Sequence, residues 1–206
     1  FDGYAQQFYS IYLEDQKNPF KKIIDRYLRY SMFLRFKKVS EIIKTTESKE
    51  ILDVGSGPGW HDFLLAKYSS VKVTGIDVAP NMIEISKNLS DVNQMNAELE
   101  FILADIMDYK FEKKYDTIFA LGVVEYFEDP LSLIRILKDI ATKRVIFSVP
   151  VLNHWLTPQR KIRYKLRKCP LWFYDEEKIE NMLEKLLLNK YHIHDLGRDY
   201  LVEIII

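Results

Sequence analysis

A glycine-rich turn at residues 55–59 is the part of this chain best suited to bind a ligand. It follows the apolar run Ile51–Val54, and residues 60–67 can open a helix directly after it. Glycine carries no Cβ and tolerates positive φ, so backbone here can approach a ligand closely. The N–H groups at a helix N-terminus favour a polar or anionic ligand part. Strand, turn and helix together predict the nucleotide-binding corner of an α/β sheet.

Acidic residues end the next two predicted strands. Asp77 follows an apolar strand near residues 71–76, and Asp105 follows another near 99–103. A carboxylate at the end of the second strand can accept both ribose hydroxyls of an adenosine. NAD enzymes use the same arrangement, so Asp77 alone does not identify the nucleotide.

The spacing of the glycines separates the nucleotide classes. The dinucleotide pattern G-x-G-x-x-G requires a third glycine at position 60, which is Trp60. A P-loop is excluded because no Gly-Lys-Ser/Thr follows the turn. The segment Asp53-Val-Gly55-Ser-Gly57-Pro-Gly59 instead resembles the first motif of class I S-adenosylmethionine (SAM)-dependent methyltransferases.

Three later segments resemble further motifs of that family: 75–83, 101–106 and 115–127. The resemblance covers residues 50–150 and implies SAM as methyl donor and S-adenosylhomocysteine (SAH) as product. It places the ribose hydroxyls on Asp77, the adenine amino group on Asp105, and the adenine ring on the neighbour of Asp105. The residues implied in SAM binding are Asp53, Gly55, Ser56, Gly57, Gly59, Asp77, Val78, Met82, Asp105, Ile106 and Leu121.

Apolar runs that alternate with helical patterns predict the fold. We expect strands near 51–54, 71–76, 99–103, 116–120 and 144–149, and helices over 60–67, 80–90 and 130–142. This alternation predicts a parallel sheet with right-handed crossovers. A helix over 175–188 and apolar segments 191–196 and 200–206 then resemble the C-terminal end of the class I fold. The expected fold is an α/β, Rossmann-like three-layer sandwich, whose seven-stranded, mostly parallel sheet has an antiparallel last strand.

We interpret the 206 residues as a single methyltransferase domain with four parts. Residues 1–48 form an N-terminal helical lid, with helices over 4–15 and 19–44, and residues 49–150 form the SAM-binding core. Residues 151–174 form a substrate-side insertion, and residues 175–206 form the C-terminal helix and hairpin. The lid carries the aromatic residues Tyr4, Phe8, Tyr9 and Tyr12.

Methyl transfer is an in-line displacement that requires alignment of the reactants and exclusion of water. A hydroxyl nucleophile often also needs a general base. His154, in the insertion, is the foremost candidate base, while Glu125 and Tyr126 follow the fourth strand near the expected methyl position. His61, at the start of the first helix after the turn, faces either the cofactor or solvent. His192 and His194 are interpreted as structural.

Composition limits the partners. Lys+Arg and Asp+Glu both total 30, and zero net charge argues against a stable nucleic-acid partner. A basic run at 160–168 is either a solvated helix face or a surface for an anionic acceptor. The single cysteine, Cys169, gives no disulfide or metal framework and is compatible with a cytoplasmic location. We expect no metal, no membrane span and no signal peptide, and the oligomeric state stays open.

The leading hypothesis is methyl transfer to a small-molecule acceptor, foremost at oxygen, with nitrogen and carbon open. Segments 25–36 and 150–174 resemble the magnesium-protoporphyrin O-methyltransferase and quinone-biosynthesis methyltransferases. The alternatives are an RNA or other nucleic-acid methyltransferase and a non-catalytic SAM-binding module. An NAD-dependent oxidoreductase is a distant further alternative because of Trp60.

Overall fold

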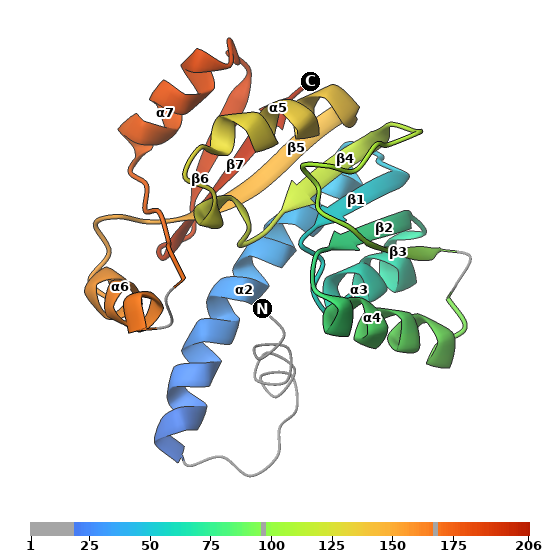
Figure 1. The fold of residues 1–206 in the computed structure, drawn as a ribbon, viewed down its shortest axis with the longest axis horizontal. Coiled ribbons are helices and arrows are strands. Elements are labelled where there is room, and N and C mark those ends of the chain that lie inside the picture. Colours follow the sequence, from blue (N-terminus) through green and yellow to red (C-terminus); the bar gives the residue numbers. More distant parts are fainter. Residues whose placement is uncertain (1–18, 96–97, 167–168) are drawn as a thin grey trace. The chain divides into compact units, whose positions relative to one another are not determined.

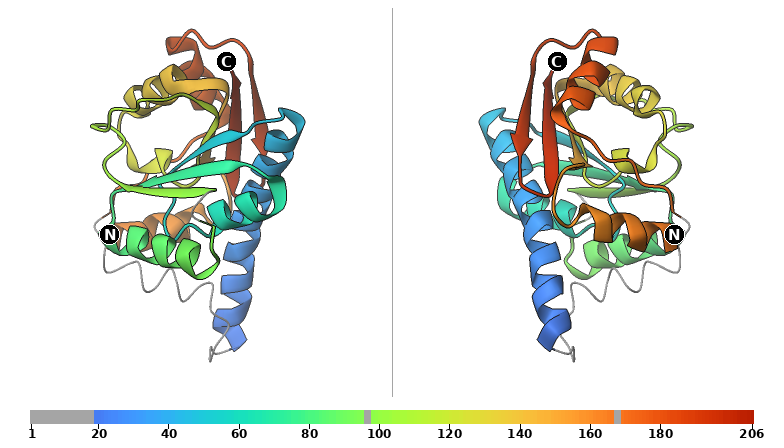
Figure 2. Two further views of the ribbon diagram at one scale, coloured as in Figure 1. Left: turned by 90° about the vertical axis from the view of Figure 1, so that its right-hand side faces the viewer. Right: turned by 90° about the vertical axis from the view of Figure 1, so that its left-hand side faces the viewer.

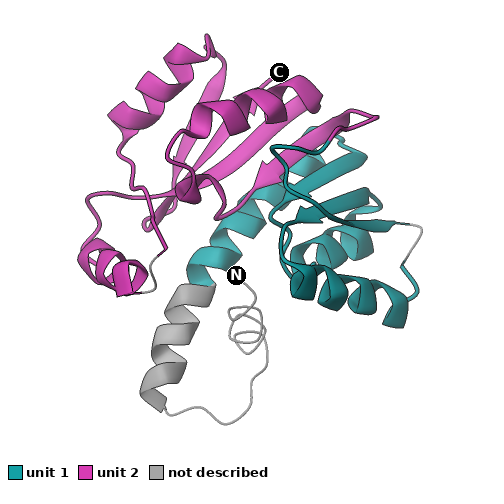
Figure 3. Ribbon diagram, in the orientation of Figure 1, with its two compact units in different colours: residues 1–109 teal, residues 110–206 magenta. Residues whose placement is uncertain are grey.

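The computed structural model describes residues 19–95, 98–166 and 169–206, with side chains from residue 30 onward. The chain divides into two compact units, residues 1–109 and 110–206 (Figure 3). The predicted helix over 4–15 lies outside the described residues, as do its four aromatic side chains. That these parts make up a single domain stays a prediction.

The first unit consists of helices and parallel strands in alternation (Figure 1). Its elements are α2 (Pro19–Thr45), β1 (Glu50–Val54), α3 (Trp60–Ser69), β2 (Lys72–Asp77), α4 (Pro80–Val92) and β3 (Leu99–Leu103). Strand β2 pairs in parallel with β1 on one side and with β3 on the other. Ile51 and Leu52 are fully buried, because a parallel strand has both faces covered.

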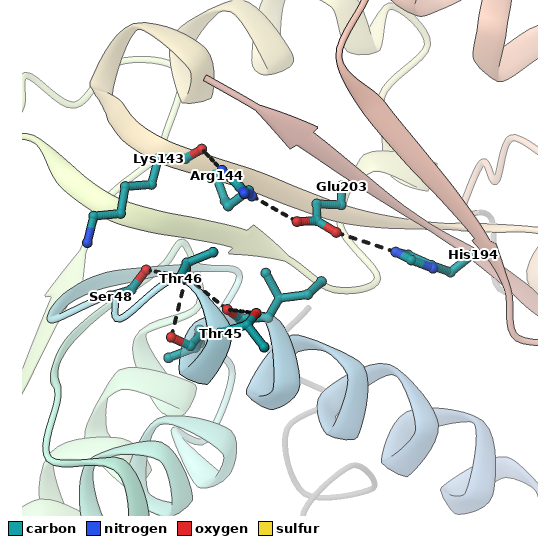
Figure 4. A network of polar contacts seen from close by, with 9 residues as sticks. Thr45, Thr46, Ser48, Lys143, Arg144, His194 and Glu203 are labelled. Atoms are coloured by element: carbon teal, nitrogen blue, oxygen red, sulfur yellow. Dashed lines mark hydrogen bonds and ion pairs between the residues drawn. The ribbon is translucent and has the colours of Figure 1, made fainter.

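Polar side chains end helix α2 (Figure 4). The Thr46 hydroxyl donates to the Ile42 carbonyl at 2.8 Å and lies 2.8 Å from the Ser48 hydroxyl. Glu47 then takes a positive φ of 50°, which turns the chain out of the helix and toward β1.

The second unit begins with a parallel strand pair and ends in an antiparallel hairpin. Its elements are β4 (Tyr115–Ala120), the 3₁₀ helix η1 (Val124–Tyr126), α5 (Pro130–Ile140), β5 (Ala141–Pro150), α6 (Thr157–Leu166), α7 (Glu176–Lys185), β6 (Tyr191–Asp195) and β7 (Asp199–Ile205). Strand β4 pairs in parallel with β5, and β7 runs antiparallel to both β5 and β6. Figure 2 shows this hairpin from two further sides.

Charged side chains connect the three strands of this antiparallel part (Figure 4). Arg144 Nε on β5 donates to Glu203 Oε1 on β7 at 2.8 Å. The second Glu203 oxygen lies 3.5 Å from His194 Nε2 on β6. These contacts support the interpretation of His194 as a structural residue.

The described strands form a seven-stranded sheet in the order β3-β2-β1-β4-β5-β7-β6. This confirms the predicted α/β fold and its antiparallel last strand. Most boundaries differ from expectation by one or two residues. The larger differences are at β5, which begins at Ala141 directly after α5 ends at Ile140, and at α7, which ends at Lys185. Helix α6 was expected only as one interpretation of the basic run at 160–168, the solvated helix face. Among its residues only Thr157 is buried.

We predict that Gly59→Ala destabilises the protein more than Gly57→Ala. Both glycines have positive φ, so each substitution has a backbone cost of about 1 kcal/mol. A Cβ on Gly59 would also lie 2.7 Å from Phe101 Cζ and 2.8 Å from Ser86 Cβ, whereas one on Gly57 would meet nothing within 4 Å. The clash should add about 1–3 kcal/mol, measurable by urea unfolding. Equal losses would show that the packing around Gly59 relaxes freely.

Candidate functional site

The glycine turn of the first unit is fixed to the end of β2 by a carboxylate. Asp77 Oδ2 accepts a hydrogen bond from the Gly57 N–H, and Oδ1 accepts one from the Ala79 N–H, both at 2.9 Å. The Gly55 N–H donates to the Ile76 carbonyl at 2.8 Å. Each carboxylate oxygen has a further lone pair, so Asp77 can hold the turn and still accept ribose hydroxyls.

The turn presents open backbone at Gly57. Gly55, Gly57 and Gly59 all have left-handed φ values, of 72°, 55° and 71°. The empty space where a Gly57 Cβ would stand allows a ligand to approach the main chain there. Ser56 lies in the same turn, and its buried Oγ has no hydrogen-bond partner among the described residues. A polar ligand fits this combination of open space and an unsatisfied hydroxyl.

Two carboxyl groups are buried together beneath this turn. Asp53 on β1 is 3% exposed and Asp62 on α3 is fully buried, and their carboxyl groups are within hydrogen-bonding reach of each other. Burial raises the pKa of Asp53 well above its ordinary value, and the nearby Asp62 and Asp77 raise it further. Burial likewise raises the pKa of Asp62 to about 7. At neutral pH this pair therefore retains a proton more readily than ordinary carboxyl groups do.

Asp62 was not predicted as a site residue from the sequence, because an acid in the first turn of a helix is common and usually exposed. A signal was nonetheless present. Asp62 stands four residues before the buried Ala66, which places both side chains on the same face of α3.

The residues expected around the adenine lie after β2 and β3. Asp105 is exposed, and its Oδ1 accepts a hydrogen bond from the Met107 N–H at 2.9 Å. Val78 is 51% exposed, so its side chain is available for ligand contact, whereas Ile106 and Met82 are buried in the unit. Val78 is thus better placed than Ile106 to cover a ring, although both assignments stay predictions.

His61 packs against α2 and does not project into solvent. Its ring stacks on Phe36 with the centroids 4.6 Å apart. Burial lowers the pKa of His61 to about 4, and the Arg35 charge lowers it further. The ring is therefore neutral at physiological pH and serves packing.

In the second unit, a buried guanidinium holds two carboxylates. The Arg160 head group on α6 lies 3.0 Å from Glu125 Oε1 on η1 and 2.9 Å from Asp199 Oδ1 on β7. These side chains are 12%, 2% and 4% exposed, respectively. Burial opposes the Arg160 charge, but the two carboxylates outweigh it and raise the pKa of Arg160 above its ordinary value. Glu125 is thus engaged in an ion pair that ties η1 to α6.

Tyr126 and His154 have polar partners as well. The Tyr126 hydroxyl lies 3.5 Å from the Tyr164 hydroxyl, and burial, with Tyr164 and Glu125 nearby, raises the pKa of Tyr126 well above its ordinary value. His154 Nδ1 accepts the Leu156 N–H at 3.2 Å, which leaves the proton of the neutral ring on Nε2. Burial and the Arg198 charge lower the pKa of His154. In this arrangement the Tyr126 hydroxyl and the His154 Nε2 both carry a proton. His154 could accept a proton only at Nδ1, so a role as base requires that the Leu156 N–H leave that atom.

Leu121 follows β4 in a loop fixed by a side chain of β5. The Gly122 N–H donates to the Ser148 hydroxyl at 2.9 Å, and Gly122 takes a positive φ of 76°. Leu121 is half-buried in this loop. Its contact with a cofactor stays a prediction.

Helix α6 and the segment after it line a cavity of about 380 Å³ that is wide open to solvent. Its lining includes Lys161 and Lys165, one helical turn apart, with Tyr164, Leu171 and Phe173. The Lys161 ammonium lies 5.2 Å from the centre of the Phe173 ring. The Trp172 N–H donates to the Glu125 carbonyl at 2.9 Å, which fixes this segment to η1. The cavity therefore has an aromatic wall and a basic rim.

The described residues hold no cluster of three His, Cys, Asp or Glu side chains that could bind a metal ion. Over the same part of the chain, no helix combines the length and the apolar character needed to cross a bilayer.

The sequence matches the methyltransferase-domain family over residues 45–186. Among curated proteins, it is 28% identical to tRNA U34 carboxymethyltransferase of Campylobacter curvus over 126 residues, or 60% of this chain and 41% of that protein. It is 30% identical to ubiquinone biosynthesis O-methyltransferase of Coxiella burnetii over 102 residues, or 50% of this chain and 42% of that protein. The chain thus spans about two-fifths of the length of these curated relatives.

Solved structures share the fold over nearly the whole chain. The structure of magnesium protoporphyrin IX methyltransferase from Synechocystis PCC 6803 with bound SAH has a TM-score of 0.78 at 19% identity, and the match covers 99% of this chain and 97% of that one. A methyltransferase-type structure from Methanococcus maripaludis has a TM-score of 0.64 at 20% identity, covering 93% of this chain and 96% of that one. At these identities the likeness concerns the fold.

We predict that Arg160→Met strongly destabilises the protein, because it leaves Glu125 and Asp199 buried without their shared cation. Removal of one partner from a buried ion pair costs about 3–5 kcal/mol. Urea unfolding measures the loss, and Arg135→Met, which alters an exposed arginine on α5, serves as the matched control. A loss no larger than that of the control would contradict the clamping role of Arg160.

Proposed function

The chain belongs to the methyltransferase-domain family, and from that premise we propose that it transfers the methyl group of SAM to an oxygen atom of a small, anionic acceptor molecule. The observation that carries the acceptor proposal is the cavity with its two lysines and aromatic wall. Bound SAM supplies a methyl group already activated by its sulfonium. The remaining task of the protein is to bind, align and exclude water.

Several features of the first unit support SAM binding. Asp77 offers lone pairs beyond its two backbone hydrogen bonds, and Gly57 leaves space beside the turn. The buried acids Asp53 and Asp62 complement a positively charged group, and SAM carries an ammonium at its amino-acid end. We propose that Gly55, Ser56 and Gly59 shape the turn around that end, and that Val78, Met82, Asp105 and Ile106 complete the part of the binding site in this unit.

The cavity of the second unit supports a small acceptor with an apolar body and an anionic group. About 380 Å³ lies within the range of small-molecule pockets. Lys161 and Lys165 are exposed and can pair with a carboxylate or phosphate. Phe173 is 8% exposed, so it forms a fixed apolar surface for the rest of the molecule. Two relatives are named ubiquinone biosynthesis O-methyltransferase and trans-aconitate 2-methyltransferase, and a structural neighbour is named magnesium protoporphyrin IX methyltransferase.

The three predicted catalytic residues favour an acceptor oxygen that is already ionised. Glu125 is ion-paired, Tyr126 stays protonated, and the His154 Nδ1 lone pair is engaged by backbone. An ionised oxygen provides its own nucleophilic electron pair, so it needs no proton acceptor. We propose that Tyr126 positions the acceptor, that Glu125 positions η1, and that His154 acts as base only for a hydroxyl acceptor.

A nucleic-acid acceptor is the second candidate, because a relative is named as a tRNA carboxymethyltransferase. The basic run at 160–168 was its main support in the sequence. In the structure Arg160 is buried in ion pairs, which removes one charge from any phosphate-binding surface. An RNA substrate would show binding that weakens steeply with added salt, whereas a small acceptor would show a weaker salt dependence.

Release of SAH from SAM tests the proposal directly. The assay supplies SAM with a panel of small carboxylic acids, phenols and phosphorylated alcohols, and in parallel with transfer RNA. We expect turnover with a small anionic acceptor and methylation at its oxygen, identified by mass spectrometry. Turnover with RNA alone would refute the small-molecule proposal.

We predict that Asp77→Ala weakens SAH binding by about 2–3 kcal/mol, through loss of charged hydrogen bonds to the ribose. Loss of the Gly57 N–H partner should add to the effect by loosening the turn. Isothermal titration calorimetry measures the dissociation constant, with the exposed Asp108→Ala as control. An unchanged constant would refute the assignment of Asp77.

We predict that replacing Lys161 and Lys165 together by glutamine raises the KM for the small acceptor by about tenfold or more, because two charge-assisted contacts are lost. The kcat and the SAH affinity should change less than about twofold. Lys178→Gln with Lys185→Gln, on exposed positions of α7, is the matched control. If both double variants behave alike, the acceptor does not use the lysines of α6.

A further inference from the structure

We propose that Asp53 and Asp62 share one proton in the ligand-free protein and release it to solvent when SAM binds, as the ammonium of SAM takes its place. This inference rests on SAM binding at the glycine turn, and is independent of which acceptor is methylated. It assigns a role in cofactor recognition to Asp62, which is not among the residues that the sequence motifs imply in SAM binding.

The two acids stand at either end of the glycine turn. Asp53 lies on β1 two residues before Gly55, and Asp62 lies on α3 three residues after Gly59. Asp62 is fully buried, and neither of its carboxyl oxygens receives a hydrogen bond from a donor among the described residues. Two ionised carboxylates in such contact would repel each other in a medium of low dielectric. A proton between them relieves that repulsion.

The surroundings of the pair reinforce this state. The other charged group that acts on Asp53 is Asp77, a third acid, which disfavours ionisation further. Ser56 contributes a buried hydroxyl without a partner among the described residues. His61, next to Asp62 in the chain, is neutral above about pH 4 and stacks on Phe36. The N-terminus of α3 offers a partial positive charge, which is weaker than the full charge of a bound cation.

SAM brings the complementary group. Its amino-acid end carries an ammonium with three N–H donors, and a pair of carboxylates can accept these hydrogen bonds. An adjacent cation favours the ionised form of both acids, so their pKa values fall on binding. The proton that the pair held then passes to water. The balance is one ammonium bound and one proton released, with no other reactant.

The sign of the pH dependence follows from this exchange. At any pH at which the free pair holds a proton, binding must expel it, so the affinity falls as the pH falls. The affinity should therefore rise with pH, by up to about tenfold per pH unit for each proton expelled, and become constant once the free pair is fully ionised. His61, with its pKa of about 4, makes no contribution in this range.

Calorimetry of SAH binding tests the proposal, because SAH carries the same ammonium and undergoes no reaction. Titrations at about pH 7.5 in phosphate and in a buffer of large ionisation enthalpy give the number of protons exchanged. We expect about one proton released per SAH bound. 5′-Methylthioadenosine, which has the nucleoside but lacks the amino-acid end, should release none.

The variant Asp62→Asn removes one carboxyl of the pair and supplies an amide donor that favours the ionised form of Asp53. Asp53 remains buried, so this variant should release less than one proton per SAH bound and show a weaker pH dependence of affinity than the unaltered protein. Should this variant fail to fold, the comparison of proton release with SAH and with 5′-methylthioadenosine in the unaltered protein still tests the proposal. Equal proton release with both ligands, or SAH binding with none, would overturn the proposal. Absence of SAH binding at every pH would instead refute SAM as the cofactor.

Discussion

The cost of burying a carboxylate governs the structure of both units. An ionised carboxyl group removed from water must be paired, hydrogen-bonded or neutralised. The second unit pairs Glu125 and Asp199 with one arginine. The first unit buries Asp53 and Asp62 together, which raises the pKa of both, while Asp77 accepts hydrogen bonds from two backbone N–H groups. The glycine turn is held by the hydrogen bonds to Asp77, and η1 and α6 are held together by the ion pair of Glu125 with Arg160.

The sequence predicted well whatever depends on local pattern. The apolar runs located the five parallel strands, and the glycines with Asp53 identified the turn, because strand burial and positive φ leave a direct mark on residue choice. The N-cap of α7 is a local feature of the same kind, since the Asp175 carboxylate accepts the Lys178 N–H at 3.0 Å. Such features involve residues close together in the chain.

The remaining features join residues far apart in the sequence. Arg160 contacts Glu125 and Asp199, which are 35 and 39 residues away, and no local pattern encodes such a contact. From the sequence, the basic run at 160–168 therefore resembled one exposed basic surface. In the structure its residues have different surroundings. Arg160 is structural, and Lys161 and Lys165 face a cavity. Asp62 was missed for a related reason, because its partner Asp53 lies across the turn on another element.

The ion pairs of Arg160 with Glu125 and Asp199 affect how functional residues can be identified by mutagenesis. One side chain secures both η1 and β7 to α6, so its loss removes two restraints at once. A scan that ranks positions by lost activity would place Arg160 beside residues that touch the substrate, although its contacts are all internal to the protein. In this protein, sensitivity to substitution and participation in chemistry are separate properties. They can be told apart only when the amount of folded protein is measured along with the rate.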